Sequence, residues 1–228
     1  MSRHSVVTQL AISAVRLRTM DEADLPFVVG QHRYHFPDGF FARLGRKFLR
    51  RYYQPFLHSP YARAYLAERD GRPTGYLVGV IDPAGHRSHL LRTQGRALTF
   101  SAVGALAVRP RLALHFLHTR LGRYVRVLFG RRVPGRSEGV TDARSLAVLL
   151  HVAVAPKAQS SGVGSALIDR FVADAAATGC DRVMLVTAAG PGGAGPYYLR
   201  RGWELRGEHT TVDGRPLATY ERWIAHST

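Results

Sequence analysis

The chain is poor in cysteine, in lysine and, over its middle third, in acidic residues. Its 228 residues include one cysteine, Cys180, which excludes an internal disulfide and offers no cysteine cluster for a metal. We therefore predict a reducing, cytoplasmic setting, no metal, and a packing role for Cys180. The first residues lack an apolar stretch with a small-residue cleavage site, so we expect no signal peptide, and residues 1–14 are predicted to be a flexible tail.

Long hydrophobic runs are also missing. The most apolar run, residues 97–108, is broken by Ser101 and Gly104 and is too short to cross a bilayer, which takes about 20 residues. We predict a buried helix there. A chain of 228 residues has enough apolar material for one core, and we expect a single domain over 1–228.

Acidic residues are scarce between residues 39 and 137. The formal net charge is +16, yet residues 1–38 hold four basic and four acidic residues, and residues 138–228 hold nine of each. The 19 basic residues between them are balanced only by Glu68, Asp70 and Asp82. Biased coding explains why 30 of the 32 basic residues are arginine, but it does not explain the missing acids.

Two segments carry this charge. In residues 39–53, Arg43, Arg46, Lys47 and Arg50 recur at helical spacing, with Phe and Leu side chains on the other face. Residues 85–136 contain no acidic residue and are predicted to be a basic helical insertion, with an amphipathic helix over 111–132. Either these helices present solvated arginines to water, or they recognise an anionic molecule or surface. Nucleic acid is disfavoured, because no zinc-finger, RNA-recognition or helix-turn-helix pattern occurs.

The most informative motif lies in the neutral C-terminal part, from Val152 to Gly164. A strand stops at Pro156 and feeds a loop with Gly162 and Gly164, which opens a helix predicted from Ser165 to Thr178. The first N–H groups of a helix are unpaired and partly positive, and glycines let the backbone approach a ligand closely. This arrangement is typical of a phosphate-binding loop.

A second strand, residues 182–187, leads through a glycine-rich loop to Y-Y-L-R-R-G-W, from Tyr197 to Trp203. This segment follows the earlier segment Gln159-Ser-Ser-Gly-Val-Gly164. The order and spacing of the two segments resemble the acetyl-CoA signature of the GNAT N-acetyltransferase family, and the resemblance extends over residues 146–224. The resemblance implies an α/β fold, with a mixed, mostly antiparallel sheet that splays at the acetyl-CoA site and helices on both faces. Upstream, a strand at 16–18, a capping box from Thr19 to Glu22, and hairpins at Asp70-Gly71 and Asp213-Gly214 fit this fold.

The resemblance also implies the site residues. Tyr198 would be the general acid that protonates the leaving thiolate, since a phenol of pKa about 10 is close to a thiol of pKa about 8.5. Tyr197 fits a core aromatic better. The strand before the loop would act through its backbone, which pairs with pantetheine and meets the thioester carbonyl. The implied acetyl-CoA-binding set is Val152, Ala153, Val154, Gln159, Ser160, Ser161, Gly162, Val163, Gly164, Ser165, Ala194, Tyr198 and Arg200.

Two departures from the family pattern concern the loop and the base. Pro191 stands where relatives often have Asn. Many relatives supply a Glu or His at the positions of Val148 and Leu150, which cannot accept a proton, and strand alternation predicts that the neighbouring His151 points to the opposite face. The proton of the attacking amine would then have to pass to a water chain, or to a histidine of the N-terminal half such as His32 or His35.

We therefore predict an acyl-CoA-dependent N-acetyltransferase, with direct attack by an amine acceptor in a ternary complex. The acceptor is expected to be anionic: a phosphorylated, nucleotide-linked or lipid-linked amino sugar, a small metabolite, or a carrier-bound amine. Two alternatives stay open, an acyl-CoA sensor with little turnover and a basic adaptor on an anionic membrane or nucleic acid. A homodimer and a peripheral contact with the inner membrane surface are compatible with the sequence.

Overall fold

A computed structural model describes residues 15–37, 39–93, 146–211 and 214–225. The predicted tail at 1–14, the apolar run at 97–108 and the amphipathic helix at 111–132 lie outside these residues. In the described part of the chain, no helix is long and apolar enough to span a membrane.

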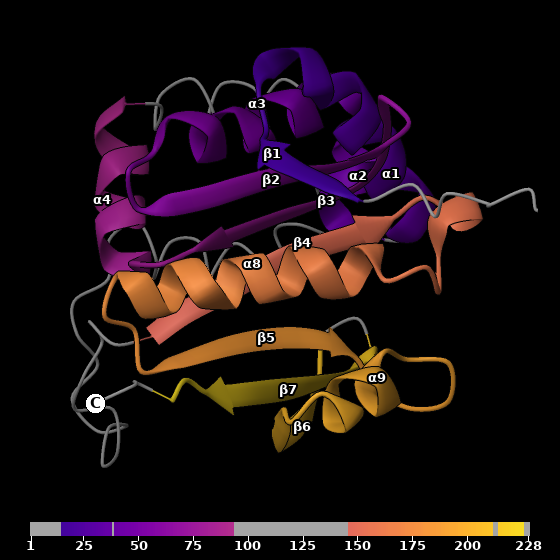
Figure 1. Ribbon diagram of the computed structural model, residues 1–228, viewed down its shortest axis with the longest axis vertical. Coiled ribbons are helices and arrows are strands. Elements are labelled where there is room, and N and C mark those ends of the chain that lie inside the picture. The colour runs from indigo at the N-terminus through magenta and orange to yellow at the C-terminus, as the bar shows by residue number, and fades with distance from the viewer. Residues whose placement is uncertain (1–14, 38, 94–145, 212–213, 226–228) are drawn as a thin grey trace, which may run out of the picture.

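The strands of the described residues form one sheet in the order β1-β2-β3-β4-β5-β7-β6 (Figure 1). Only β4 and β5 run parallel, and each other neighbouring pair is antiparallel. This confirms the predicted mixed, mostly antiparallel sheet. The strands are β1 (Arg16–Thr19), β2 (Ala62–Arg69), β3 (Arg72–Val80), β4 (Leu146–Val154), β5 (Arg182–Ala188), β6 (Glu204–Thr210) and β7 (Pro216–Trp223).

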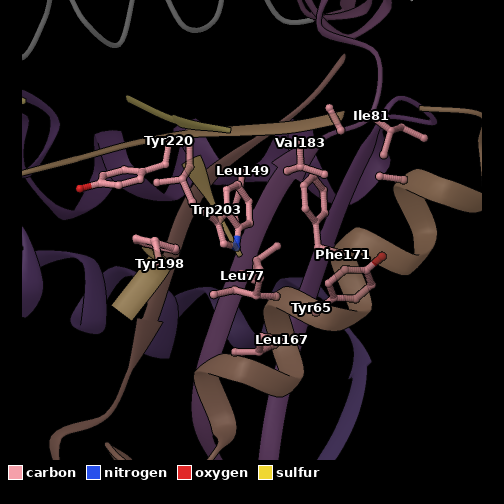
Figure 2. Packing of buried hydrophobic residues seen from close by; sticks show 14 of the residues in the cluster. Tyr65, Leu77, Ile81, Leu149, Leu167, Phe171, Val183, Tyr198, Trp203 and Tyr220 are labelled. Atoms are coloured by element: carbon pink, nitrogen blue, oxygen red, sulfur yellow. The ribbon is translucent and has the colours of Figure 1, made fainter. Parts of the chain in front are cut away.

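Helices cover both faces of the sheet, as predicted. They are α1 (Leu25–His35), α2 (Phe40–Leu44), α3 (Arg46–His58), α4 (Pro83–Thr93), α8 (Val163–Ala177) and α9 (Gly195–Arg200). Successive strand residues point to opposite faces, so Leu77 joins a core under α8, whereas Tyr76 and Val78 join a second core under α1 and α3. In the first core, Leu167 and Phe171 of α8 lie on the strands (Figure 2).

The hairpin predicted at Asp70-Gly71 is present, and both residues have positive φ, 52° and 70°, as a two-residue turn requires. The predicted capping box is wrong by two residues. Thr19 belongs to β1, so the box is formed by Asp21 and Asp24 around a short 3-10 turn. The Asp24 carboxylate also accepts two hydrogen bonds of 2.7 Å from Arg18, which ties this turn to β1.

The basic segment predicted as one helix over 39–53 is two helices, because Gly45 interrupts it with φ 96°. The prediction of one apolar and one basic face is confirmed. Phe40, Leu44 and Phe48 pack together in a small core, and the cations of α2 and α3 are exposed. These exposed cations, Arg43, Arg46, Lys47, Arg50 and Arg51, are called the basic face below.

Candidate active site

The central feature of the site is the place where β4 and β5 part. The two strands pair from Leu146 with Arg182 to Leu149 with Leu185, and no further. β4 continues to Val154, bonded on its other edge to β3, and β5 continues beside β7. Residues 150–154 of β4 therefore have a free edge on the side that faces β5, where no strand pairs with them. An extended ligand with amide groups can pair with such an edge.

A β-bulge at Leu150 lies where the strands part. On β3, Gly79 pairs with Leu149 and the adjacent Val78 pairs with His151, so Leu150 is the extra residue. A bulge bends its strand and changes which face the following side chains occupy. Accordingly, Ala147 and Leu149 lie in the core under α8, whereas Ala153, after the bulge, lies in the core under α1 and α3.

The loop after β4 leads into the start of α8. Ser160 and Gly162 adopt positive φ, 59° and 85°, and α8 begins at Val163, two residues before the predicted start. No side chain caps this end, and the first intrahelical bond is donated by Ala166 to the Gly162 carbonyl. The N–H groups of the first turn therefore point out of the helix without an intrahelical acceptor, which suits an anionic ligand.

Gly164 lies against β4. A Cβ at this position would lie 3.4 Å from a methyl group of Val154, so the helix start and the strand are in close contact. Val163 is fully buried, which leaves only its backbone for a ligand. The Ser161 hydroxyl donates to the Ala158 carbonyl at 2.6 Å and stabilises the turn before the helix.

Tyr198 lies on α9 and belongs to the core under α8. It is 5% exposed and packs against Trp203 and Tyr220, with ring centroids 5.6 and 5.8 Å away (Figure 2). Burial, and secondarily Tyr197, raises the pKa of Tyr198 to about 12, so the phenol stays protonated at neutral pH. Its hydroxyl makes no hydrogen bond within the described residues and is not among their enclosed polar atoms.

Tyr197 is less buried than Tyr198, contrary to the expectation that it is the core aromatic of the pair. Its hydroxyl lies 3.1 Å from the Ser165 hydroxyl in the first turn of α8. Tyr197 therefore joins α9 to the start of α8. In the loop before α9, Gly190 and Gly192 adopt positive φ of 88° and 89°.

A group of histidines and tyrosines lies on the other side of β4. The Tyr52 hydroxyl is 3.2 Å from Nε2 of His151, and the rings of His151 and His32 are 5.0 Å apart. His32 Nδ1 lies 2.7 Å from the Tyr53 hydroxyl, which is 2.9 Å from that of Tyr76. Helices α1 and α3 and strands β3 and β4 thus meet in one cluster, in which ring contacts join two hydrogen-bonded groups.

The orientation of His151 corrects the prediction from strand alternation. The bulge at Leu150 places His151 on the face that packs under α1 and α3, together with Ala153 and Val148. Burial lowers the pKa of His151 to about 3, with His32 as a further cause. Burial alone lowers the pKa of His32 to about 4. Both rings are therefore neutral at physiological pH.

Similarity to known proteins agrees with this architecture. Residues 111–203 match the acetyltransferase (GNAT) family. The chain carries a GNAT acetyltransferase domain. Enzymes of this family transfer an acetyl group from acetyl-CoA to amines, so the chain is an N-acetyltransferase and acetyl-CoA is its donor. A search of curated proteins finds no match.

Solved structures share the GNAT fold at low sequence identity. An N-acetyltransferase from Staphylococcus aureus Mu50 has 13% identity and a TM-score of 0.57, over 93% of this chain and 100% of the other. Ard1 from Thermoplasma volcanium has 14% identity and a TM-score of 0.56, over 93% and 99%. The acetyltransferase yncA from Salmonella typhimurium, solved with acetyl-CoA, has 12% identity and a TM-score of 0.55, over 94% and 96%.

Within this GNAT domain, the predicted donor-site residues lie along one path. It runs from the free edge of β4 (Val152, Ala153, Val154) through the loop (Gln159, Ser160, Ser161, Gly162) into the first turn of α8 (Val163, Gly164, Ser165). Ala194 precedes α9, which carries Tyr198 and the exposed Arg200. The described residues contain no group of histidines, cysteines or acids that could hold a metal.

Sequence reasoning missed Tyr52 and the role of His151. Tyr52 and His151 are 99 residues apart in the chain, and no local pattern reports such a contact. The feature that reorients His151 is the extra residue in β4. It can be detected only once the pairing register of β4 against β3 is known.

Proposed function

We propose that this enzyme acetylates an amine that belongs to an anionic acceptor, by direct attack in a ternary complex. Residues of β4 and α8 would bind the donor, and Tyr198 would act as the general acid. The observation that supports this proposal best is the end of β4–β5 pairing at Leu149, which leaves a free strand edge beside the uncapped start of α8.

The backbone of the donor-binding residues fits acetyl-CoA. The edge of residues 150–154 offers backbone N–H and C=O groups to the two amides of pantetheine. The first turn of α8 offers N–H groups and the positive end of the helix dipole to the pyrophosphate. The glycine at 164 leaves the α8 start close to Val154. The bound donor supplies an activated acetyl group.

Tyr198 would complete the transfer. The acceptor nitrogen bonds to the carbonyl carbon, the C–S bond breaks with its electron pair on sulfur, and the phenol gives its proton to that sulfur. The surplus proton on nitrogen leaves to water, from which the phenolate is reprotonated. The pKa of Tyr198 is about 12, but a thiol in the same surroundings has a raised pKa as well, because burial disfavours both anions.

The basic face supports the anionic acceptor. Its cations stand on the outer side of α2 and α3, and the sequence of the two helices contains no acidic residue. On α3, Tyr53 and Leu49 are fully buried, whereas Arg46, Lys47 and Arg50 are exposed on the opposite side. The basic face therefore points away from the sheet. It suits the anionic body of a carrier or a lipid-linked acceptor better than a small anion near β4.

The donor part of the proposal is tested with Tyr198→Phe and the matched control Tyr197→Phe. We expect Tyr198→Phe to lower kcat by roughly 10²-fold with little change in acetyl-CoA affinity by calorimetry, and Tyr197→Phe to change kcat far less. Equal loss of kcat and affinity in Tyr198→Phe would make this residue structural. If acetyl-CoA neither binds nor slows hydrogen exchange in residues 152–165, the donor site is wrong.

The acceptor part is tested with the double variant Arg46→Gln/Arg50→Gln. Binding to anionic lipid vesicles should exceed binding to neutral vesicles, fall with salt, and weaken in the variant. A pair of exposed arginines outside the basic face and outside the donor site, Arg16→Gln/Arg72→Gln, gives a charge-matched control. Indifference to lipid charge rejects a membrane-borne acceptor. Binding of acetyl-CoA without thiol release over a broad panel of amines would favour the sensor alternative.

A further inference from the structure

The cluster around His151 lies next to the point where β4 and β5 part. The donor site uses the edge of β4 that faces β5, and His151 follows the last β4–β5 pair by two residues. Its ring points under α1 and α3, between Tyr52, His32 and Phe36. A nitrogen bound next to His151 is therefore close to the place where the strands part.

The cluster has an enclosed part and an accessible part. His32, Tyr53 and Tyr76 are at most 2% exposed, and the two short hydrogen bonds at Tyr53 hold them together. Tyr52 and His151 are only partly buried. The enclosed residues fix the position of the His151 ring, and the Tyr52–His151 pair is the part that another molecule can reach.

Among the described residues, the side chains in printed contact with His151 are neutral, and none is a carboxylate. The titratable side chains that face His151 are His32 from α1 and Tyr52 and Tyr53 from α3, with Tyr76 of β3 behind them. No ion pair between described residues includes any of them. A carboxylate beside the reacting nitrogen would stabilise an ammonium ion and could take its proton. These residues can do neither, but they can exchange hydrogen bonds with a neutral amine.

We propose that the Tyr52–His151 pair holds the acceptor nitrogen by hydrogen bonds and selects it in the uncharged form, so that weakly basic amines such as an α-amino group are the substrate class. This inference rests on the proposed function and names the amine of its acceptor. Selection of the uncharged amine also makes a general base at the positions of Val148 and Leu150 unnecessary, because the uncharged amine attacks directly and needs no deprotonation beforehand.

The magnitude follows from ordinary amine ionisation. An α-amino group has a pKa of about 7.8 and a lysine side chain of about 10.4, so at about pH 7 the uncharged fraction of the α-amine is larger by roughly 300-fold. The greater nucleophilicity of the more basic amine offsets part of this ratio. The position of the pH break is the firmer signature, because kcat/KM should rise with pH until the pKa of the free substrate amine, and not that of an enzyme group.

The test compares two peptides of the same composition, one with a free α-amine and acetylated lysine, the other with a blocked N-terminus and a free lysine. We expect faster acetylation of the first at neutral pH and a break in log kcat/KM near the α-amine pKa of about 8. For the lysine peptide, kcat/KM should still rise at that pH. Equal kcat/KM values with a shared break would overturn the inference.

Two variants assign the effect to the pair. Tyr52→Phe keeps the ring packing but removes the hydroxyl, and should lower kcat/KM about tenfold for both peptides with unchanged acetyl-CoA affinity. His151→Asp adds a carboxylate, and should move the preference towards the lysine peptide and the pH break to lower values. His86→Gln, which changes the buried histidine of α4, is the matched control and should alter neither the peptide preference nor the pH break. Unchanged kinetics in both Tyr52→Phe and a folded His151→Asp would overturn the inference.

Failure of the proposed function gives a different result. If acetyl-CoA binds but no amine is acetylated, the transferase proposal fails, and this inference with it. If both peptides are acetylated but the pH break does not follow the substrate amine, only the assignment of Tyr52 and His151 fails.

Discussion

Buried histidines should make this fold sensitive to mild acid, and His86 provides the clearest single case. It is 5% exposed, its Nδ1 lies 2.9 Å from the Ser59 hydroxyl, and its ring stacks on Phe56 at 4.9 Å. Among the described residues, Nε2 is enclosed without a hydrogen-bond partner, so the charged form would be poorly solvated. Burial, and secondarily His89, lowers the pKa of His86 to about 4.

The sign and size of the effect follow from proton linkage. The unfolded chain binds a proton at His86 below its ordinary pKa of about 6.5, whereas the folded protein does not until about 4, so stability is lost as the pH falls between these values. At about pH 5 the loss is roughly 2 kcal/mol per histidine with a folded pKa near 4. His32 and His151 have similarly lowered pKa values, so the loss for the wild-type protein approaches about 6 kcal/mol.

The assay is urea unfolding between about pH 6.5 and pH 5, a range above the titration of most carboxylates. The fluorescence of the buried Trp203 monitors the unfolding. His86→Gln removes one titrating group, and should reduce the pH-dependent loss by about 2 kcal/mol, although its stability at neutral pH is lower. The control is Leu167→Val in the core under α8, which lowers stability without removing a titrating group and should keep the wild-type slope. If a folded His86→Gln loses stability with the same pH slope as the wild type, the link between burial and acid sensitivity is refuted.

Two glycine substitutions test the backbone geometry of the site and of the core. Gly162 has φ 85°, so Gly162→Ala should lower stability by about 1–2 kcal/mol and weaken acetyl-CoA binding, measured by calorimetry. The control is Gly179→Ala at the other end of α8, where φ is 79°. This variant should lose similar stability but keep the affinity for acetyl-CoA. Equal affinities in the two variants would contradict a donor site at the helix start. At Gly79 a Cβ would lie 2.5 Å from the Phe171 ring, so Gly79→Ala should destabilise by about 1–3 kcal/mol through overpacking, and an unchanged urea midpoint would contradict it.

The backbone elements of the proposed donor site could be predicted from sequence because their determinants are local. Pro156, Gly162 and Gly164 lie within nine residues of each other, and each has a backbone consequence that depends little on the rest of the fold. The strand, loop and helix were therefore placed correctly, with an error of two residues at the helix start. The hairpin at Asp70-Gly71 was predictable for the same reason.

The acceptor side could not be predicted in this way, because its contacts join distant segments. Simple alternation placed His151 on the wrong face, since the extra residue in β4 becomes visible only in the pairing with β3. The capping box failed for a related reason. Thr19 and Glu22 have the right spacing, but pairing of Thr19 with Tyr65 keeps Thr19 in the strand and passes the cap to Asp21.

The bulge at Leu150 gives the two sides of the site a common structural origin. It bends β4 next to its last pair with β5, which accompanies the opening of the strand edge for the donor, and it turns His151 towards α1 and α3 on the acceptor side. Without the extra residue, His151 would lie on the α8 face and its imidazole would be lost from the cluster. The length of β4, and not only its side chains, therefore sets where the Tyr52–His151 pair lies relative to the proposed donor edge, and a deletion of Leu150 should abolish turnover even if the deletion variant folds.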